Sequence, residues 1–381
     1  MKSIYFDYNA TTPLDPAVKA AMLPFFDEVW GNPSSVHHIG QRARSLLDAA
    51  RERVALVFRS KPSEIVFTSG GTESNNLAIF GTARLLRAKG RHLITSQIEH
   101  HAVLHCFQYL ERKEGFAVTY LPVNSEGLIS PDDLRKAIRP DTIFVSLMAA
   151  NNETGTIQPV AALGEICRHR GIIFHSDAVQ WFGKEPFENI LQFHADLVSV
   201  CSHKFHGPKG AGVLFIKSPL LPEPILFGGG HENERRAGTE NLSSIIGFAE
   251  AAERFIVVPV FSREKLLPLT LELIALVNSL EGVALRGSAS ARLSNTVAFT
   301  VERADSIALL AGLDMEGVCA SSGSACSAGS LEPSHVMLAL GVDQSSANSL
   351  VRFSLGRGSS LAEVLAVKNI LPVVIDRIRR G

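Results

Sequence analysis

Short apolar runs rich in β-branched residues alternate with longer amphipathic stretches through the first two thirds of the chain. The short runs predict strands, because β-branched side chains favour a pleated, buried backbone. The predicted strands are 65–68, 92–96, 117–123, 143–149, 172–176, 197–201 and 213–216. Helical spacing of apolar residues separates most of them, as in 131–138, 160–169 and the stretch that begins near Glu73. This alternation predicts an α/β fold with a mostly parallel seven-stranded sheet.

The last third of the chain has a different pattern. A long amphipathic segment, 262–280, precedes predicted strands at 295–300 and 350–355 and a C-terminal helix. Ser360 and Glu363 have the spacing of a capping box at the start of that helix. We therefore expect a large domain over residues 15–258 and a smaller α+β domain built from 1–14 and 259–381.

Composition narrows the class of protein. The chain has 381 residues, of which 46% are hydrophobic and 20% charged, with a formal net charge of -1. Without a basic excess we expect no direct nucleic-acid partner, and without a long apolar run we expect no membrane span. The N-terminus shows no signal-peptide pattern, and the five cysteines include no Cys-x-x-Cys pair. These features predict a cytoplasmic protein without a disulfide framework.

Two reactive side chains stand in unusual contexts. Lys204 lies in Ser-His-Lys-Phe-His-Gly-Pro-Lys-Gly (202–210), directly after a predicted buried strand, where a lysine can form a Schiff base. Cys326 lies in Ser-Ser-Gly-Ser-Ala-Cys-Ser-Ala-Gly (321–329), a stretch too small and polar to bury a thiol. Together they predict an imine-forming enzyme with a second, thiol nucleophile.

Other polar residues follow the predicted strands, which is where α/β sheets bind ligands. Gly70, Gly71 and Thr72 join a strand to a helix, either as a phosphate cradle or as an ordinary turn. Asp177 can keep a pyridine nitrogen protonated or cap a helix. His100 can stack on a flat ring and move protons, or it can be a capping or solvent-exposed histidine.

Further candidates lie at later strand ends and inside an apolar strand. Asn151 and Asn152 either bind a ligand or shape a loop. Arg352 needs an anionic partner, which is either a substrate carboxylate or a structural ion pair. His101 and His105 have metal-site spacing, but no further ligand accompanies them in the sequence, so we expect no metal. Taken together, the cradle, ring partners, lysine and arginine indicate pyridoxal 5'-phosphate (PLP) acting on an amino acid.

With these motifs the chain resembles the cysteine desulfurases of the NifS/IscS type, in the class V aminotransferase group of fold-type I PLP enzymes. The resemblance runs from Tyr-Phe-Asp-Tyr-Asn-Ala-Thr-Thr-Pro (5–13) and Gly-Asn-Pro-Ser-Ser (31–35) to Arg-Phe-Ser-Leu-Gly-Arg (352–357). The stretch around Cys326 is similar to the longer catalytic loop of the NifS/IscS subgroup rather than the shorter one of the SufS subgroup.

The resemblance implies that Lys204 binds PLP covalently and that Cys326 takes sulfur from L-cysteine as a persulfide, leaving L-alanine. It implies a phosphate site at Gly71, Thr72 and His203, and ring contacts at His100, Asn152, Asp177 and Gln180. It also implies that His100 handles the substrate thiol proton and that Asn32 and Arg352 hold the substrate carboxylate. Thr239 would reach the phosphate of a second subunit, so the resemblance implies a homodimer.

Two positions depart from the family pattern. Cys201 stands where a serine often donates to the phosphate, and because a thiol is a weaker donor, Ser202 is the candidate substitute. Trp181 and Phe182 are larger than the residues usual after Gln180. The sulfur acceptor stays open among an iron–sulfur scaffold protein, tRNA thiolation and cofactor thiolation.

Two alternative functions also stay open. The nearer is another class V PLP enzyme, either a selenocysteine lyase or a small-molecule aminotransferase. The other is a non-enzymatic sulfur-relay or scaffold-binding protein on the same fold.

Overall fold

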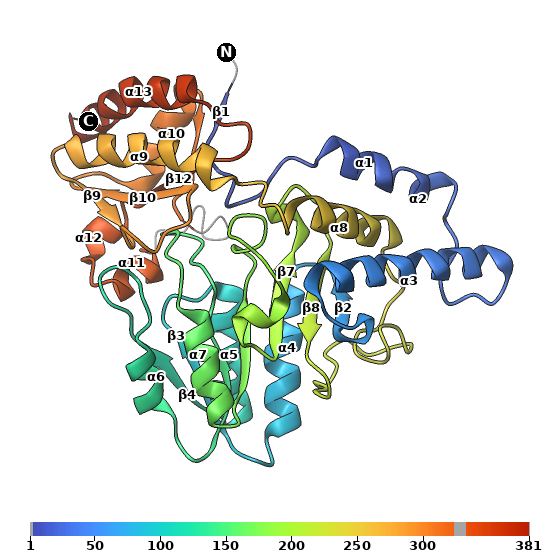
Figure 1. Cartoon of the computed structure of the whole chain (residues 1–381). Coiled ribbons are helices and arrows are strands. Elements are labelled where there is room, and N and C mark those ends of the chain that lie inside the picture. Colours follow the sequence, from blue (N-terminus) through green and yellow to red (C-terminus); the bar gives the residue numbers. More distant parts are fainter. Residues whose placement is uncertain (1–2, 324–332, 381) are drawn as a thin grey trace.

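A seven-stranded sheet forms the centre of the computed structural model, which describes residues 3–323 and 333–380 (Figure 1). Its strand order is β2-β8-β7-β6-β5-β3-β4. The strands are β2 (Ile65–Thr68), β3 (His92–Ser96), β4 (Ala117–Leu121), β5 (Thr142–Ser146), β6 (Ile173–Asp177), β7 (Leu197–Cys201) and β8 (Gly212–Ile216). Only β8 runs antiparallel to its neighbours in this sheet. The predicted α/β fold with a mostly parallel seven-stranded sheet is confirmed.

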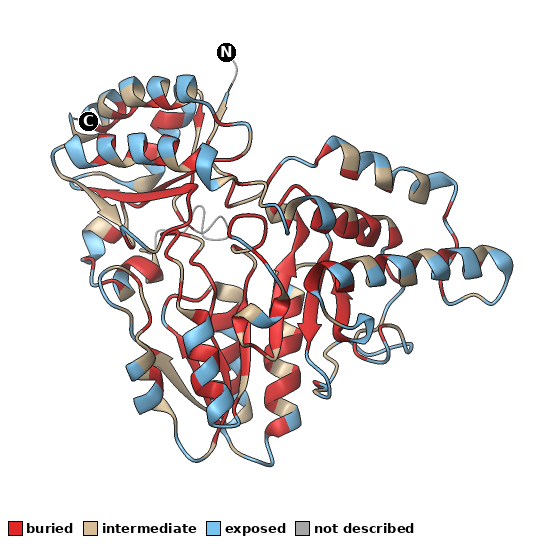
Figure 2. Ribbon diagram, viewed as in Figure 1, coloured by how far each residue is buried: buried red, intermediate tan, exposed pale blue. Residues whose placement is uncertain are grey.

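Helices cover both faces of this sheet. One apolar cluster joins the sheet to α4 (Gly71–Leu86) and α5 (His101–Glu114). A larger cluster covers the opposite face with α1 (Pro16–Met22), α3 (His38–Phe58), α7 (Val160–His169) and α8 (Leu242–Phe255). The short helices α2 (Pro24–Asp27) and α6 (Pro131–Ala137) lie at its margins. Because both faces are covered, strands β5, β7 and β8 are buried along their whole length (Figure 2).

A second, smaller sheet lies beyond residue 280. In it β10 (Thr296–Val301) pairs antiparallel with β9 (Val283–Arg286) on one side and β12 (Val351–Ser354) on the other. Helices α9 (Arg263–Ser279), α10 (Ser306–Met315) and α13 (Leu361–Arg380) enclose a separate apolar core with it. The predicted capping box of α13 is confirmed, because the Ser360 N–H donates to the Glu363 carboxylate at 2.9 Å.

The N-terminus joins this second core. Strand β1 (Ile4–Tyr5) pairs parallel with β11 (Val318–Cys319), and Phe6 and Tyr8 are buried among the residues of the smaller core. The short helices α11 (His335–Ala339) and α12 (Gln344–Ala347) follow later in the chain. The division into 15–258 against 1–14 and 259–381 stays a prediction that fits these two cores. Within the described ranges, no helix combines the length and the apolar character that crossing a membrane requires.

Candidate active site

A cavity of about 230 Å³ lies where the carboxyl ends of the central strands meet the second core. Predicted site residues from both parts of the chain line it: Gly71, Thr72, His100, Asn152, Asp177, Gln180, His203, Lys204 and Arg352. The fold therefore brings together residues that lie as far apart in the sequence as Gly71 and Arg352. The predicted nucleophile Cys326 lies outside the described residues.

Lys204 reaches the cavity from a single turn of 3-10 helix, η3 (Ser202–Lys204), that directly follows β7. Its Nζ donates to the main-chain oxygens of Asn9 at 2.7 Å and Ala10 at 2.8 Å. Burial lowers the pKa of Lys204 from 10.5 to about 8, because the ammonium loses hydration. A substantial share of this amine is therefore uncharged and nucleophilic near neutral pH.

The N-terminus of α4 provides a site for an anion on the same cavity. Gly70, with φ of 151°, turns the chain from β2 into the helix, and as the N-cap residue it offers no side chain to the first helical N–H groups. A Cβ at Gly71 would lie 2.8 Å from Val179 Cγ2, so the backbone approaches its neighbour more closely than a side chain permits. The free N–H groups and the helix dipole favour a negatively charged ligand beside Thr72.

His203 lies on the same cavity wall, and its Nδ1 is 3.1 Å from Thr11 Oγ1. Burial lowers the pKa of His203 to about 3, with Lys204 and Lys209 acting in the same direction. The ring is therefore neutral at physiological pH and can offer a hydrogen bond without adding charge.

Asp177 is the last residue of β6 and points a carboxylate at the cavity. Its Oδ2 accepts from Asn75 Nδ2 at 2.7 Å, and its Oδ1 accepts from the Val179 N–H at 3.0 Å. The second contact shapes the turn after the strand rather than capping a helix. Two donors hold the carboxylate in place, so it can face a protonated ring nitrogen.

His100 both caps a helix and lines the cavity. It is the N-cap of α5, where its Nδ1 accepts from the Ala102 N–H at 3.1 Å, and it also lines the cavity. Since Nδ1 accepts, the neutral ring carries its proton on Nε2. Burial lowers the pKa of His100, and the charge of Asp177 opposes that effect.

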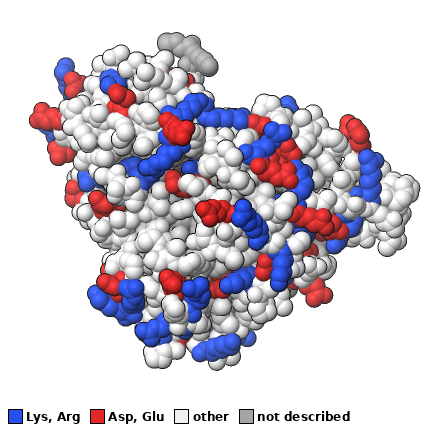
Figure 3. All heavy atoms as spheres, viewed as in Figure 1, with Lys and Arg blue, Asp and Glu red and all other residues white. Residues whose placement is uncertain are grey.

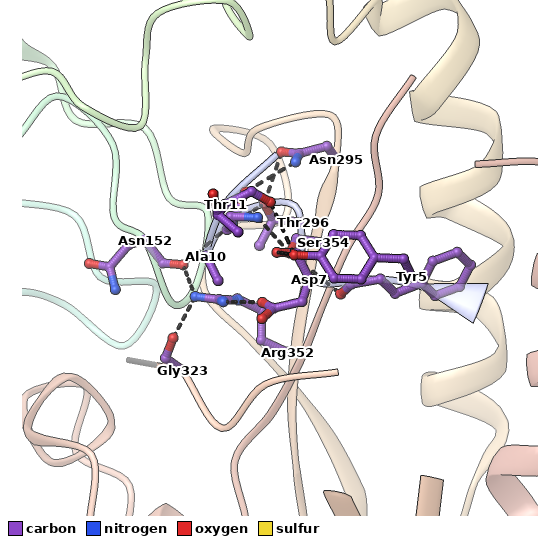
Figure 4. A network of polar contacts seen from close by, with 12 residues as sticks. Tyr5, Asp7, Ala10, Thr11, Asn152, Asn295, Thr296, Gly323, Arg352 and Ser354 are labelled. Atoms are coloured by element: carbon purple, nitrogen blue, oxygen red, sulfur yellow. Dashed lines mark hydrogen bonds and ion pairs between the residues drawn. The ribbon is translucent and has the colours of Figure 1, made fainter. Parts of the chain in front are cut away.

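Arg352 extends from β12 into a dense polar network (Figure 4). Its Nη2 forms an ion pair with Asp7 Oδ1 at 2.6 Å, and its Nη1 donates to the main-chain oxygens of Asn152 at 2.7 Å and Gly323 at 2.5 Å. Its Nε is buried and has no hydrogen-bond partner among the described residues. The structural ion pair therefore exists, and the same guanidinium lines the cavity.

Five residues proposed from the sequence do not line this cavity: Gly70, Asn151, Ser202, Asn32 and Thr239. The Asn151 side chain shapes its loop, because its Oδ1 accepts from the Glu153 and Thr154 N–H groups at 2.9 Å. The Ser202 hydroxyl donates to the main-chain oxygen of Pro208 at 2.6 Å and lies 3.0 Å from that of Ala211, so it belongs to the turn before β8. Cys201 lines the cavity instead, and burial raises its pKa, which keeps the thiol protonated. Asn32 is exposed between α2 and α3. Thr239 is exposed beside a different cavity of about 150 Å³.

The bulky residues after Gln180 pack beneath the site rather than in it. Phe182 stacks on Phe58 with ring centroids 5.5 Å apart, and Trp181 meets Phe193 edge-on at 5.4 Å. These rings belong to the large apolar core and do not line the cavity. The two positions that depart from the family pattern therefore lie in the core and not on the cavity wall.

Several residues of the site carried no role in the sequence analysis. Asn9 is the main example, because its main-chain oxygen accepts from both Lys204 and Gln180. Asn75 holds Asp177, and Lys184 contacts Asn9 and Gln180. Among these residues, Lys184 stands out in the local sequence, because it is a lysine among the apolar residues that follow β6.

A third imidazole joins the pair His101 and His105. The ring of His335, at the start of α11, lies 4.8 Å from that of His101, which in turn stacks on His105 at 4.8 Å. His335 Nε2 lies 3.0 Å from the main-chain oxygen of Glu99. The described part of the chain contains no group of three or more His, Cys, Asp or Glu residues arranged to hold a metal ion.

The donor set of the cavity fits PLP. The first turn of α4 lacks a side-chain cap and suits a phosphate, and the fixed carboxylate of Asp177 suits a pyridinium nitrogen. The buried amine of Lys204 suits an aldehyde. Each group matches a different chemical feature of the cofactor.

Comparison with known proteins decides the family. The family described as aminotransferase class-V matches residues 4–367. The chain belongs to this family. It is 46% identical to a protein named cysteine desulfurase IscS from Dictyoglomus turgidum, over 99% of this chain and 96% of that protein. The identity to a protein of the same name from Methanosarcina thermophila is 45%, over 99% and 93% of the two chains.

A solved structure described as a NifS-like protein matches this family member at a TM-score of 0.90 and 35% identity, with both chains fully covered. The resemblance to the NifS/IscS type is thereby confirmed. The prediction of a PLP-dependent enzyme is confirmed with it, because class-V aminotransferases use this cofactor.

Proposed function

We propose that this chain is a PLP-dependent cysteine desulfurase, which converts L-cysteine to L-alanine and passes the sulfur to Cys326. One observation carries the proposal: a buried lysine of lowered pKa shares its cavity with Asp177, the uncapped α4 terminus and Arg352. The names of the IscS relatives over the full chain support the choice of cysteine as substrate.

The bound cofactor would supply an electron sink for the negative charge that develops at the substrate Cα. Gly71, Thr72 and His203 would hold its phosphate. The ring would lie among His100, Asn152, Asp177 and Gln180, which line the same cavity. Lys204 would hold it covalently.

The chain's own residues would orient the substrate and move its protons. Arg352 would hold the substrate carboxylate from the cavity wall, beside its ion pair with Asp7. Lys204, whose pKa is about 8, would take the proton from Cα as a general base. His100 is neutral at physiological pH because burial lowers its pKa. Its acceptor nitrogen is Nδ1, so it would accept the proton of the substrate thiol there, with the thiol replacing the Ala102 N–H as partner.

The thiolate of Cys326 would attack the sulfur of L-cysteine. An S–S bond forms, the substrate C–S bond breaks, and the protons return to the carbon skeleton, which leaves as L-alanine. The balance is L-cysteine plus a cysteine thiol giving L-alanine plus a cysteine persulfide, without an external oxidant. A thiol reductant or an acceptor protein then removes the outer sulfur.

We further infer that the enzyme is a cytoplasmic homodimer that passes sulfur to an acceptor such as an iron–sulfur scaffold protein. Thr239 is exposed and does not line the active-site cavity of its own chain, as expected of a residue that reaches the phosphate in a second subunit. Asn32, also exposed, remains the second candidate for the substrate carboxylate. Acidic and basic side chains are interspersed on the face drawn in Figure 3, which gives no support there to a nucleic-acid partner.

The deciding experiment combines a spectrum with product analysis. The purified protein should show a visible band near ~400 nm from bound PLP. With L-cysteine and dithiothreitol, it should release sulfide and alanine in equal amounts. Alanine without sulfide would refute sulfur transfer, and turnover that depends on an added keto acid would identify an aminotransferase. Preference for selenocysteine in a competition assay would identify a selenocysteine lyase.

A further inference from the structure

Lys184 is a buried lysine that the proposed reaction does not use. It is 2% exposed and lies beneath the cavity, in the turn after β6. No carboxylate of the described residues lies within ion-pair distance of it, and its Nζ lies 5.3 Å from the centre of the Phe261 ring. A buried lysine without an ion pair is costly, so its polar contacts must account for its presence.

Within 3–323 and 333–380, Lys184 makes two hydrogen bonds, both to amide side chains. Its Nζ donates to Asn9 Oδ1 at 2.6 Å and to Gln180 Oε1. A lysine has no acceptor, so both amides must turn their oxygens towards it and their nitrogens away. Lys184 therefore helps to set which end of each amide faces the rest of the site. Asn295 holds Asn9 in the same orientation, because its Nδ2 also donates to Asn9 Oδ1 at 3.1 Å.

The fixed amides connect Lys184 to the reactive lysine. With its Oε1 bound to Lys184, Gln180 donates one Nε2 hydrogen to the main-chain oxygen of Asn9 at 3.0 Å. The second Nε2 hydrogen remains available to a ligand, because Gln180 itself lines the cavity. The same Asn9 oxygen accepts from Lys204 Nζ at 2.7 Å. Only Asn9 therefore separates Lys184 from Lys204 in this chain of contacts.

We propose that Lys184 is a positioning residue that makes Gln180 an N–H donor to the cofactor ring oxygen and holds the Asn9 carbonyl against Lys204. The proposal rests on the proposed function, since it assigns Gln180 a PLP contact. Without Lys184, the Gln180 amide would keep only the contact of Nε2 with the Asn9 main-chain oxygen. It would then more often turn and present its oxygen to the cavity, where it would repel an anionic ring oxygen.

The charges around Lys184 fit this role. Burial lowers its pKa well below 10.5, and the positive charges of Lys204 and Arg352 lower it further, while Glu185 opposes them. These effects disfavour the positive charge of Lys184 but leave its N–H groups, which the two amide oxygens accept.

The first test replaces Lys184 by Met, which has a similar length and no donor, with exposed Lys136→Met as the matched control. PLP is titrated into the apoprotein, and the pH midpoint of the visible band, kcat and KM are then measured on the reloaded enzyme. Lys184→Met should weaken PLP binding roughly tenfold and move the band midpoint. Lys136→Met should match the wild type in all four measurements.

A double-mutant cycle with Gln180→Met tests whether Lys184 acts through Gln180. The double variant should bind PLP no more weakly than the weaker single variant, because both changes remove the same donor. Independent effects that multiply, or a Lys184→Met variant with wild-type PLP affinity and spectrum, would overturn the proposal.

If Lys184→Met fails to fold, PLP binding by Gln180→Glu still tests the proposal. Glutamate keeps an acceptor for Lys184 but has no N–H to offer, so PLP binding should weaken as in Gln180→Met. Wild-type PLP affinity in Gln180→Glu would overturn the proposal. A wild-type protein that shows neither a PLP band nor sulfide would instead refute the proposed function, which separates the two failures.

Discussion

The lowered pKa of Lys204 gives a quantitative prediction for the apoprotein. An ordinary lysine with a pKa near 10.4 is about 0.1% uncharged at pH 7.5. With a pKa of about 8, Lys204 would be roughly a quarter uncharged at that pH. Only the uncharged amine is nucleophilic, so the structure predicts that Lys204 reacts on the order of 200-fold more readily than its ordinary pKa would allow.

Competitive trace labelling measures this difference directly. The apoprotein and an N-acetyl-lysine amide standard are labelled together with trace acetic anhydride from pH 6 to 11, and the Lys204 peptide is quantified by mass spectrometry. Labelling of Lys204, expressed relative to its plateau, should be half-maximal near pH 8, while the standard is half-maximal near ~10.4. Added PLP should protect Lys204, which controls for the identity of the site.

The charges of Asp177 and Arg352 determine in which direction two substitutions should shift the labelling midpoint of Lys204. Asp177 raises the pKa of Lys204 and Arg352 lowers it. Asp177→Asn should therefore move the labelling midpoint to lower pH, and Arg352→Met should move it to higher pH. A wild-type midpoint that coincides with the standard would refute the argument from burial, and shifts of the opposite sign would refute the argument from charge.

Three other predictions concern the nucleophile and two buried carboxyl groups. Cys326→Ala should keep the PLP band but make almost no alanine from L-cysteine; normal turnover would contradict the persulfide route. Glu232→Gln should lower the free energy of unfolding in urea by about 3–5 kcal/mol, because it breaks the buried pair with Arg51 at 2.6 Å, and a change below about 1 kcal/mol would contradict that cost. Burial raises the pKa of Glu99 to about 8, so its contribution to stability should fade as pH rises from about 4.5 through 8; Glu99→Gln should flatten the wild-type decline in melting temperature there, and an unchanged slope would contradict it.

The local pattern was enough to locate the elements of the large sheet. The predicted 197–201 strand and 160–169 helix coincide with β7 and α7, because alternation and helical spacing are properties of neighbouring residues. The strand predicted over 143–149 ends at Ser146, although the Leu147 and Ala149 N–H groups still donate to the main-chain oxygens of His175 and Asp177 in β6. Met148, between them, lines the cavity. Apolar composition alone does not show where the strand gives way to the cavity wall.

The antiparallel direction of β8 was not predicted. The connection from β7 to β8 includes the single turn η3 and no helix, and such a short link cannot carry the chain back for a parallel strand. The length of that connection indicates the direction of β8, whereas the apolar residues of the strand are compatible with either direction.

The sequence by itself determined the kind of chemistry, because the residue types around Lys204 and at the strand ends limit what the site can bind. Only the tertiary structure decided which of these residues are neighbours. The ion pair of Arg352 with Asp7 and the contact of Lys204 with Asn9 join residues 345 and 195 positions apart. Ser202 turns away from the cavity while Cys201 faces it, although they are adjacent in the sequence. Such placements depend on how the two cores pack together, and no local pattern in the sequence records that packing.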